Sequence, residues 1–239
     1  MHRAEEAIIL VGGLGTRLRT EVADLPKPLA PVAGRPFLAW LLDQYAEAGL
    51  RRVILAAGYR AEAVVEAIGR RWRGMDIVYS LEAEPLGTGG AVRLAAEMLQ
   101  GDGAFISNGD TFLRYRPAEL EDQVRQEGLR LGLALAAVPA LDRFGAADTR
   151  DGRVVGFREK GATGAGRINA GHYFASAQGL ADLPAQASYS FETQVLEPWV
   201  SAGWVAAFDA TSDFLDIGIP SDYRRAQDLL PPWAEGPSP

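Results

Sequence analysis

A glycine-rich segment near the start of the chain has the residue types of a phosphate-binding loop. The segment Gly12-Gly13-Leu14-Gly15-Thr16-Arg17 follows a short apolar run that has the length of a buried strand. Glycines placed directly after a strand let the backbone approach a ligand and turn its N–H groups toward it. Thr16 and Arg17 add a hydroxyl donor and a positive charge. We therefore expect this loop to bind a polyphosphate.

Two familiar phosphate loops do not match this segment. A Walker loop requires a lysine followed by serine or threonine after the last glycine, whereas Thr16-Arg17 stands here. A dinucleotide fingerprint requires a glycine three residues after Gly15, and that position is Leu18. The pattern thus disfavours a P-loop enzyme and a nicotinamide-binding module.

Lysine and asparagine are rare enough in this chain to draw attention to their positions. The 24 basic residues include only Lys27 and Lys160 as lysines, and the asparagines are Asn108 and Asn169. Lysine is a compact point charge, whereas arginine is a broad planar fork, so a lysine here indicates a site that arginine would not serve. Prolines on both sides of Lys27 make its segment stiff and extended, which would aim the charge in advance. Chance is the alternative for any one of these residues.

Two aspartates follow apolar runs in the pattern expected of a metal site. Asn108-Gly109-Asp110 comes after a predicted strand, and Asp216 comes after Phe214-Leu215. An aspartate just beyond the carboxyl end of a parallel strand lies in the crevice where such sheets bind ligands. Mg²⁺ prefers one or two carboxylates together with phosphate oxygens and water. An ordinary turn aspartate is the alternative, most strongly for Asp216.

The segment from Glu82 to Gly90 follows a predicted strand and enters a helix. Guanine presents two adjacent N–H donors, and a carboxylate such as that of Glu82 only accepts hydrogen bonds. Uracil and thymine present one donor beside an acceptor, which suits an amide better. If a nucleotide base lies against this segment, the carboxylate favours GTP; the alternatives are a Glu82 that points to solvent and a base that is read by backbone groups.

Alternating strands and helices are expected to position these segments. The pattern predicts strands at 7–11, 53–57, 77–80, 104–107, 131–138 and 204–208, and helices at 36–48, 61–68, 90–99, 117–127, 191–199 and 221–230, the last behind a serine cap. Strands joined by helices pair in parallel and are covered on both faces. Residues 144–174 are punctuated by glycines and predict hairpins. We expect one α/β domain over 1–230, a Rossmann-like, mostly parallel sheet flanked by helices with a small inserted antiparallel β substructure, and a flexible tail over 231–239.

Composition restricts the class of protein further. Hydrophobic content of 48% and charged content of 23% over 239 residues are typical of a soluble globular domain. The first apolar run is too short for a signal peptide and no run approaches the roughly 20 residues of a membrane span, so we expect a cytoplasmic protein without a membrane partner. A net charge of −7 argues against nucleic acid as a partner, and the absence of cysteine excludes disulfides and thiolate chemistry.

Taken together, the glycine-rich loop and Pro26-Lys27-Pro28 resemble the sugar-1-phosphate nucleotidyltransferase (nucleotide-sugar pyrophosphorylase) family, and the resemblance extends to about Tyr223. Residues 85–91, 108–112, 159–160 and 168–171 are similar to those of the D-glycero-α-D-manno-heptose 1-phosphate guanylyltransferases. The resemblance implies a GT-A-like fold that transfers GMP from GTP to a sugar 1-phosphate, with Mg²⁺ as cofactor.

The resemblance also assigns roles to individual residues. The metal ligands are Asp110 and Asp216. The nucleotide-binding residues are Gly12, Gly13, Gly15, Thr16, Glu82, Pro85, Gly87, Thr88, Asn108 and Gly109. The sugar-phosphate-binding residues are Gly145, Glu159, Lys160, Asn169, Gly171 and Glu192. The catalytic cations are Arg17 for pyrophosphate, Lys27 for the transferred phosphate and Lys160 for the sugar phosphate.

Two alternative functions remain at this stage. One is a uridylyl- or thymidylyltransferase acting on a hexose or amino-sugar 1-phosphate. The other is a non-catalytic module that binds a nucleotide-sugar. The complete set of Arg17, Lys27, Asp110 and Asp216 speaks against the module, because binding alone does not need both metal ligands. His172 is expected to be a packed strand residue rather than a catalyst.

Overall fold

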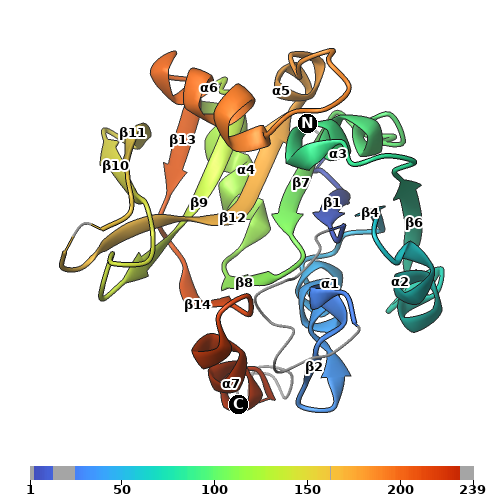
Figure 1. Ribbon diagram of the computed structural model, residues 1–239. Helices are drawn as coiled ribbons and strands as arrows, with labels where there is room; N and C mark the ends of the chain where they lie inside the picture. Colours follow the sequence, from blue (N-terminus) through green and yellow to red (C-terminus); the bar gives the residue numbers. More distant parts are fainter. Residues whose placement is uncertain (1–2, 13–24, 162, 232–239) are drawn as a thin grey trace.

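The computed structural model describes residues 3–12, 25–161 and 163–231 (Figure 1). Most of the predicted phosphate loop, including Gly13, Gly15, Thr16 and Arg17, lies outside these residues, as does nearly all of the predicted tail. The described residues contain one ten-stranded sheet with the strand order β10-β11-β13-β9-β12-β7-β1-β4-β6-β5. The expected α/β class is confirmed.

The first half of the chain forms the parallel part of this sheet. Its members are β1 (Glu6–Leu10), β4 (Arg52–Ala57), β6 (Met75–Leu81) and β7 (Gly103–Asn108). β1 pairs in parallel with β4 and β7, and β4 pairs in parallel with β6. The short β5 (Arg71–Trp72) adds an antiparallel edge. The carboxyl ends of four parallel strands therefore meet along one edge of the sheet.

The second half extends the same sheet with mostly antiparallel pairs. Its members are β9 (Leu131–Val138), β10 (Ala146–Arg150), β11 (Arg153–Arg158), β12 (Gly166–Ser176) and β13 (Val205–Phe208). β12 joins the two halves, because it pairs antiparallel with β7 on one side and with β9 on the other. The predicted antiparallel substructure is thus continuous with the parallel sheet.

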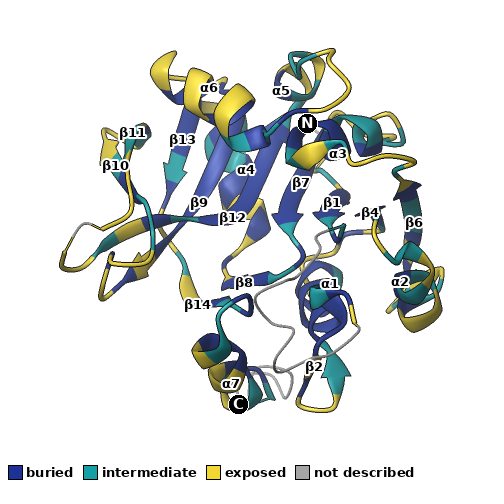
Figure 2. Ribbon diagram, in the orientation of Figure 1, coloured by how far each residue is buried: buried dark blue, intermediate teal, exposed yellow. Residues whose placement is uncertain are grey.

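Helices cover both faces of the sheet, as parallel pairing requires. Ile8 and Ile9 are both fully buried on adjacent positions of β1, and each belongs to a different core cluster. One cluster contains residues of α1 (Phe37–Glu47), α2 (Ala61–Ile68) and α4 (Pro117–Gln126), and the other contains residues of α3 (Gly87–Ala96) and α6 (Glu197–Ser201). Figure 2 shows buried residues along the central strands and exposed ones on the outer surface of the helices.

The structure corrects the cap of one predicted helix, the start of a second and the helix type of a third. α7 spans Pro220–Leu229 and its N-cap, Ile219, makes no side-chain cap bond, so the predicted serine cap is wrong. Proline takes the first helical position because it has no N–H to satisfy there. α3 begins at Gly87, three residues earlier than predicted. The helix predicted over 191–199 is a π-helical turn, η3 (Glu192–Leu196), followed by α6.

His172 on β12 is packed inside the sheet, as predicted. Its side chain is 1% exposed and meets the Tyr115 ring edge-on. Burial lowers the pKa of His172 to about 4, because a charged imidazolium would lose its hydration there. The residue is therefore neutral at pH 7 and contributes packing. Among the described residues, no helix is long and apolar enough to cross a membrane.

Candidate functional site

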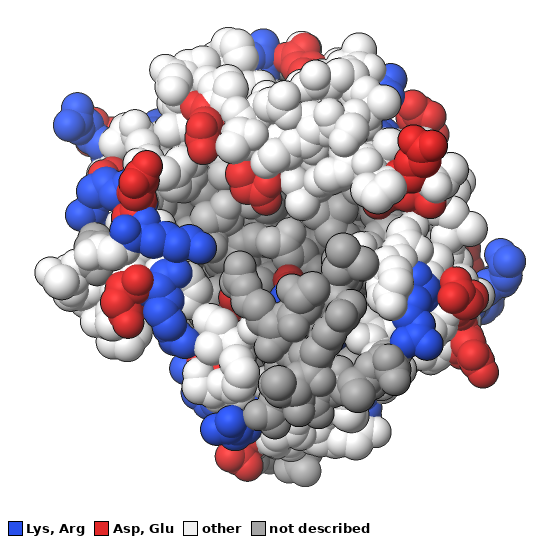
Figure 3. All heavy atoms as spheres, viewed as in Figure 1, with Lys and Arg blue, Asp and Glu red and all other residues white. Residues whose placement is uncertain are grey.

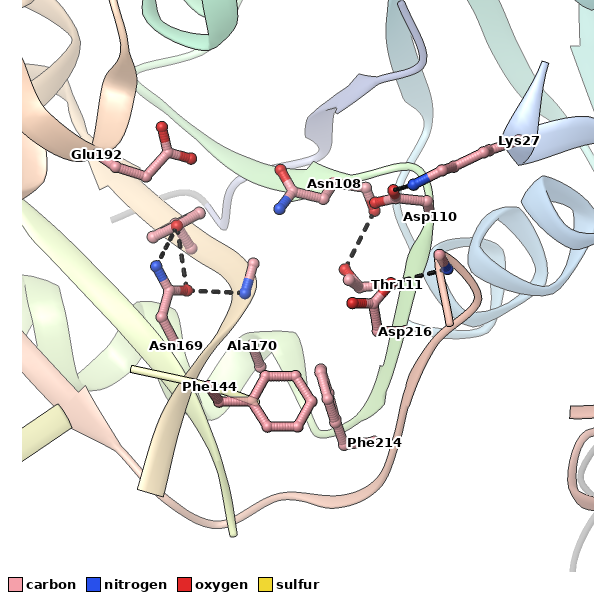
Figure 4. A pocket seen from close by; sticks show the side chains of 13 residues that line it. Lys27, Asn108, Asp110, Thr111, Phe144, Asn169, Ala170, Glu192, Phe214 and Asp216 are labelled. Carbon is pink, nitrogen blue, oxygen red and sulfur yellow. Dashed lines mark hydrogen bonds and ion pairs between the residues drawn. The ribbon is translucent and has the colours of Figure 1, made fainter. Parts of the chain in front are cut away.

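Two cavities meet at the edge of the sheet where the parallel strands end. The first cavity has a volume of about 550 Å³, and the loop after β7, the middle of β12, η3 and β14 (Ser212–Asp216) line it (Figure 4). The second cavity has a volume of about 760 Å³ and lies at the carboxyl ends of β1, β4, β6 and β7. Ligands of open α/β sheets bind in this crevice. Both cavities are therefore placed to hold substrate.

Four residues line both cavities and so mark their boundary. They are Lys27, Asn108, Asp110 and Glu192. In Figure 4, Lys27 and Asp110 stand on one side of the first cavity, and Glu192 and Asn169 stand on the other. A group transferred from a ligand in one cavity to a ligand in the other would pass this boundary.

Lys27 is mounted on a short turn whose neighbours are anchored in the core. η2 (Lys27–Leu29) is a 3₁₀ turn, and the backbone N–H of Leu29 donates to the Pro26 carbonyl at 2.8 Å. Pro28 and Leu29 are buried, whereas Lys27 projects into the site. The stiff mounting predicted from the prolines is present, but as a turn rather than an extended segment. A proline fits the second position of such a turn, because no backbone donor is needed there.

Asp110 and Asp216 come together through a small second sheet. β8 (Thr111–Arg114) pairs antiparallel with β14, and Asp216 lies opposite Thr111. The N–H of Ile217 donates to the Asp110 carbonyl at 3.1 Å, and the N–H of Gly218 donates to Oδ1 of Asp216 at 2.8 Å. These bonds fix the two aspartates, which are far apart in the sequence, on one wall of the first cavity.

The charges on this wall favour a cation between the two carboxylates. Lys27 Nζ lies 3.1 Å from Oδ2 of Asp110, and the two side chains are 18% and 32% exposed. Burial and the negative charge of Asp110 raise the pKa of Asp216, while the bond from Gly218 and the charge of Lys27 oppose this rise. Two carboxylates that repel each other beside an open cavity fit a divalent cation that takes its remaining ligands from phosphate and water. The described residues contain no cluster of three or more His, Cys, Asp or Glu that would form an all-protein cage.

Gly218 leaves the space that the Lys27 side chain occupies. A Cβ added at Gly218 would lie 2.8 Å from Lys27 Nζ and 2.9 Å from Oδ1 of Asp216. We expect Gly218→Ala to displace the ammonium group and to lower turnover roughly tenfold or more, because misplacing a catalytic group by about 1 Å is enough for such a loss. Steady-state kinetics and thermal melting would measure this.

The matched control for this variant is Gly156→Ala, since a Cβ at Gly156 meets nothing within 4 Å. The unfolding temperature of Gly218→Ala should stay close to that of the control, because the displaced atoms are at the ends of two side chains, Lys27 and Asp216, and none belongs to the backbone. Unchanged turnover in Gly218→Ala would contradict the assignment of Lys27 to the reaction.

Polar groups on the opposite wall of the first cavity form a hydrogen-bonded set. Asn169 Nδ2 donates to the Tyr173 hydroxyl at 2.7 Å, and the N–H of Gly171 donates to Oδ1 of Asn169 at 2.8 Å. The rings of Phe144 and Phe214 meet edge-on and line the same cavity (Figure 4). Amide, hydroxyl and aromatic groups in this arrangement suit a polyhydroxylated ring that has polar edges and an apolar face.

The second cavity carries a carboxylate at its closed side. The carboxyl group of Glu82 lies against Gly12 and Gly58, and its Oε2 accepts a hydrogen bond from the Leu86 N–H at 3.0 Å. Pro85 and Tyr59 also line this cavity. Apolar and backbone surfaces with one fixed carboxylate suit a flat heterocycle that presents N–H donors.

Most predicted site residues that the structure describes are brought together, and a few are not. The residues that line a cavity are Gly12, Lys27, Glu82, Pro85, Gly87, Thr88, Asn108, Asp110, Asn169, Gly171, Glu192 and Asp216. Gly109 and Gly145 sit beside lining residues without lining a cavity themselves. Glu159 and Lys160 are exposed at the end of β11 and line neither cavity, so their contact with the sugar phosphate stays a prediction.

Sequence reasoning did not select Tyr173, Phe214 or Tyr59, although all three line a cavity. Tyr173 lies on the same face of β12 as Asn169, because their partners on β9, Leu133 and Leu135, are two residues apart. Strand alternation from Asn169 could therefore have identified Tyr173. Figure 3 shows basic side chains gathered at the left of the view with acidic side chains beside them, and smaller groups of both charges elsewhere on the described part of this face.

Comparisons with known proteins agree on one family. The model of the family described as "Nucleotidyl transferase" matches residues 6–231. D-glycero-alpha-D-manno-heptose 1-phosphate guanylyltransferase of Aneurinibacillus thermoaerophilus is 40% identical over 225 residues, which are 94% of this chain and 98% of the relative. The protein of that name from Campylobacter jejuni is 37% identical over 91% of this chain and 96% of its own. The crystal structure of HddC from Yersinia pseudotuberculosis complexed with GMP-PN matches with a TM-score of 0.83 and 32% identity, covering 94% of this chain and 98% of HddC.

Proposed function

The chain belongs to the nucleotidyl transferase family, and we propose that it transfers GMP from GTP to D-glycero-α-D-manno-heptose 1-phosphate, giving a GDP-heptose and pyrophosphate. The observation that carries this proposal is the boundary between the two cavities, where Lys27 and Asp110 face both. In this account the second cavity holds the nucleotide and the first holds the sugar 1-phosphate. We infer that residues 1–230 act as one catalytic unit, since one sheet runs through both halves.

The reaction joins two anions, so the barrier is mainly one of position and charge. An oxygen of the sugar phosphate attacks the α-phosphorus of GTP, and the bond from that phosphorus to the oxygen bridging to the β-phosphate breaks as pyrophosphate leaves. No general base is needed, because a phosphate oxygen is already ionised at neutral pH. Lys27 stabilises the charge on the transferred phosphate from a pre-aimed position. From the resemblance, Arg17 serves the pyrophosphate and Lys160 the sugar phosphate.

Asp110 and Asp216 fit Mg²⁺ by their chemistry and surroundings. They are two hard oxygen donors beside a cavity open to phosphate, and the charge of Asp110 adds to burial in raising the pKa of Asp216. Bound there, Mg²⁺ supplies positive charge that neutralises the phosphates of the reactants. Lys27 forms an ion pair with Asp110. The ammonium of Lys27 and a Mg²⁺ ion bound by Asp110 would therefore both place positive charge on this wall, next to the boundary.

Glu82 supports a preference for guanine over the other bases. Its carboxylate is held by the Leu86 N–H and lies against the glycine-lined side of the second cavity, so it is fixed before a base arrives. A carboxylate only accepts hydrogen bonds, and guanine offers N1–H and N2–H₂ side by side. The guanylyltransferase relatives and the GMP-PN complex of HddC support this choice.

The test is turnover by the purified protein with a panel of substrates. Each of GTP, ATP, UTP, CTP and dTTP is paired with heptose, mannose, glucose and N-acetylglucosamine 1-phosphates in the presence of Mg²⁺, and pyrophosphate release is measured. We expect GTP with the heptose 1-phosphate to give the highest kcat/KM. A maximum with UTP or dTTP would replace the proposal with a uridylyl- or thymidylyltransferase. No pyrophosphate from any pair would favour a nucleotide-sugar-binding module.

A further inference from the structure

A threonine on the nucleotide side of the site is bonded to a carboxylate on the sugar side. Thr88 is the second residue of α3 and lines the second cavity. Its Oγ1 donates to Oε2 of Glu192 at 2.8 Å and accepts from the Phe191 N–H at 2.9 Å. A hydroxyl has one proton to donate, and in Thr88 that proton goes to Glu192. The side chain therefore serves the carboxylate rather than a nucleotide oxygen.

The segments that carry these residues are joined by backbone bonds as well. The Gly89 N–H donates to the Tyr189 carbonyl at 2.9 Å, and the Tyr189 N–H donates to the Leu86 carbonyl at 2.9 Å. Gly87 has φ +68°, and a Cβ there would lie 2.6 Å from the Tyr189 carbonyl oxygen. Glycine at position 87 is thus required by this contact, whether or not a base also lies against it. The start of α3 and the segment before η3 form one tightly packed unit.

Glu192 is held so that part of its carboxylate stays available. Ser190 Oγ also donates to Oε2 at 2.8 Å, so both hydroxyl bonds go to one oxygen and leave Oε1 for a ligand. The residue opens a π-helical turn, a feature that is frequent at functional sites. Burial, and then the charge of Glu192, raise the pKa of Tyr173, so the carboxylate lies near the Tyr173–Asn169 pair on the same side of the first cavity.

We propose that Thr88 is a positioning residue for the sugar 1-phosphate: its hydroxyl fixes the Glu192 carboxylate toward the sugar hydroxyls from the nucleotide side of the site. This inference rests on the proposed function of the two cavities. A free glutamate side chain samples many rotamers, and two hydroxyl bonds remove that freedom before the sugar binds. The Pro85–Gly90 segment therefore contributes to recognition of both substrates.

The test uses steady-state kinetics to measure the KM for the sugar 1-phosphate and the KM for GTP separately. Thr88→Val keeps the shape of the side chain and removes the hydroxyl, whereas Thr88→Ser keeps the hydroxyl. Thr193→Val is the matched control, because Thr193 is exposed in the same π-helical turn, next to Glu192. Ser190→Ala removes the other hydroxyl that donates to Glu192. Glu192→Gln and the double variant Thr88→Val/Glu192→Gln complete a double-mutant cycle with Thr88→Val. Thermal melting of every variant checks folding.

We expect Thr88→Val to raise the KM for the sugar 1-phosphate roughly 10- to 100-fold, because a hydrogen bond to a charged group is lost, and to change the KM for GTP less than threefold. Ser190→Ala should shift the same KM, and Thr88→Ser and Thr193→Val should resemble the unmodified chain. The double variant should be no worse than Glu192→Gln alone, since both changes affect one interaction.

Three results would overturn the proposal: an equal or larger rise in the KM for GTP, failure of Thr88→Ser to restore the KM, or effects of Thr88→Val and Glu192→Gln that multiply. If the panel shows that the unmodified chain uses another sugar 1-phosphate or another triphosphate, the proposed substrates fail. The Thr88 inference is then decided by the same variants with the pair that is used, because it concerns the bond and not the identity of the sugar.

Discussion

Replacing Lys27 with alanine is expected to lower kcat roughly 100- to 1,000-fold, the loss typical of removing one preorganised group that stabilises a developing charge. Lys27 lines both cavities, and its ammonium lies 3.1 Å from Asp110, so it is held at the boundary where the transferred phosphate is proposed to lie. The fold should persist, because the buried residues of this segment, Pro26, Pro28 and Leu29, are unchanged and Lys27 itself is partly exposed. Pyrophosphate release and thermal melting measure the two effects.

Two further variants test whether the loss of activity is specific to the lysine side chain at position 27. Lys27→Arg should also be strongly impaired, because a planar guanidinium does not fit the space beside Gly218 that a compact ammonium fills. Arg71→Ala removes an exposed cation on β5 that lines neither cavity, and this variant should have full activity. Near-normal pyrophosphate release by Lys27→Ala would refute the role of this lysine.

Replacing Asp110 with asparagine is expected to remove most magnesium-dependent activity, by about three orders of magnitude, since a bound metal contributes several kcal/mol to such a reaction. The amide keeps the shape of the side chain but loses the charge that pairs with Lys27 and that opposes ionisation of Asp216. The KM for Mg²⁺ should rise with the loss of kcat, and Mn²⁺ binding measured by electron paramagnetic resonance should weaken in parallel.

The control for this variant is Asp76→Asn, an exposed carboxylate on β6 that pairs with Arg71. Asp76→Asn should bind Mn²⁺ and respond to Mg²⁺ like the unmodified chain. An Asp110→Asn variant with an unchanged magnesium dependence would exclude Asp110 as a metal ligand.

The parallel half of the fold could be predicted because its signals are local. Short apolar runs such as Ala7–Val11 and Val53–Ala57 are buried on both faces, so they show as continuous hydrophobic segments between helices. The strand order of the second half could not be predicted in this way, because β12 is placed by pairing with β7 and β9, which both come before it in the chain. Non-local pairing of this kind leaves no period in the sequence.

The residues of the candidate site also divide into those with a local signal in the sequence and those that non-local strand pairing brings together. Lys27 and Asp110 stood out by rarity and by position after a strand, and the structure brings them to one wall. The proximity of Asp216 depends on the pairing of β14 with β8, which spacing does not encode, so only the family resemblance placed it. The bond from Thr88 to Glu192 joins residues 104 positions apart, so the sequence did not predict it; the resemblance gave Thr88 only a contact with the nucleotide. Gly13, Gly15, Thr16 and Arg17 lie outside the described residues, so their roles stay predictions.

The central claim is that Asp110 and Asp216 hold a divalent cation beside Lys27 at the boundary of two cavities. Anomalous diffraction from crystals grown with Mn²⁺ and a non-hydrolysable GTP analogue tests it directly. We expect a manganese peak within coordinating distance of both carboxylates, with the α-phosphate next to Lys27 Nζ. A nucleotide bound with its α-phosphate remote from Lys27, or a metal bound away from both aspartates, would contradict the account.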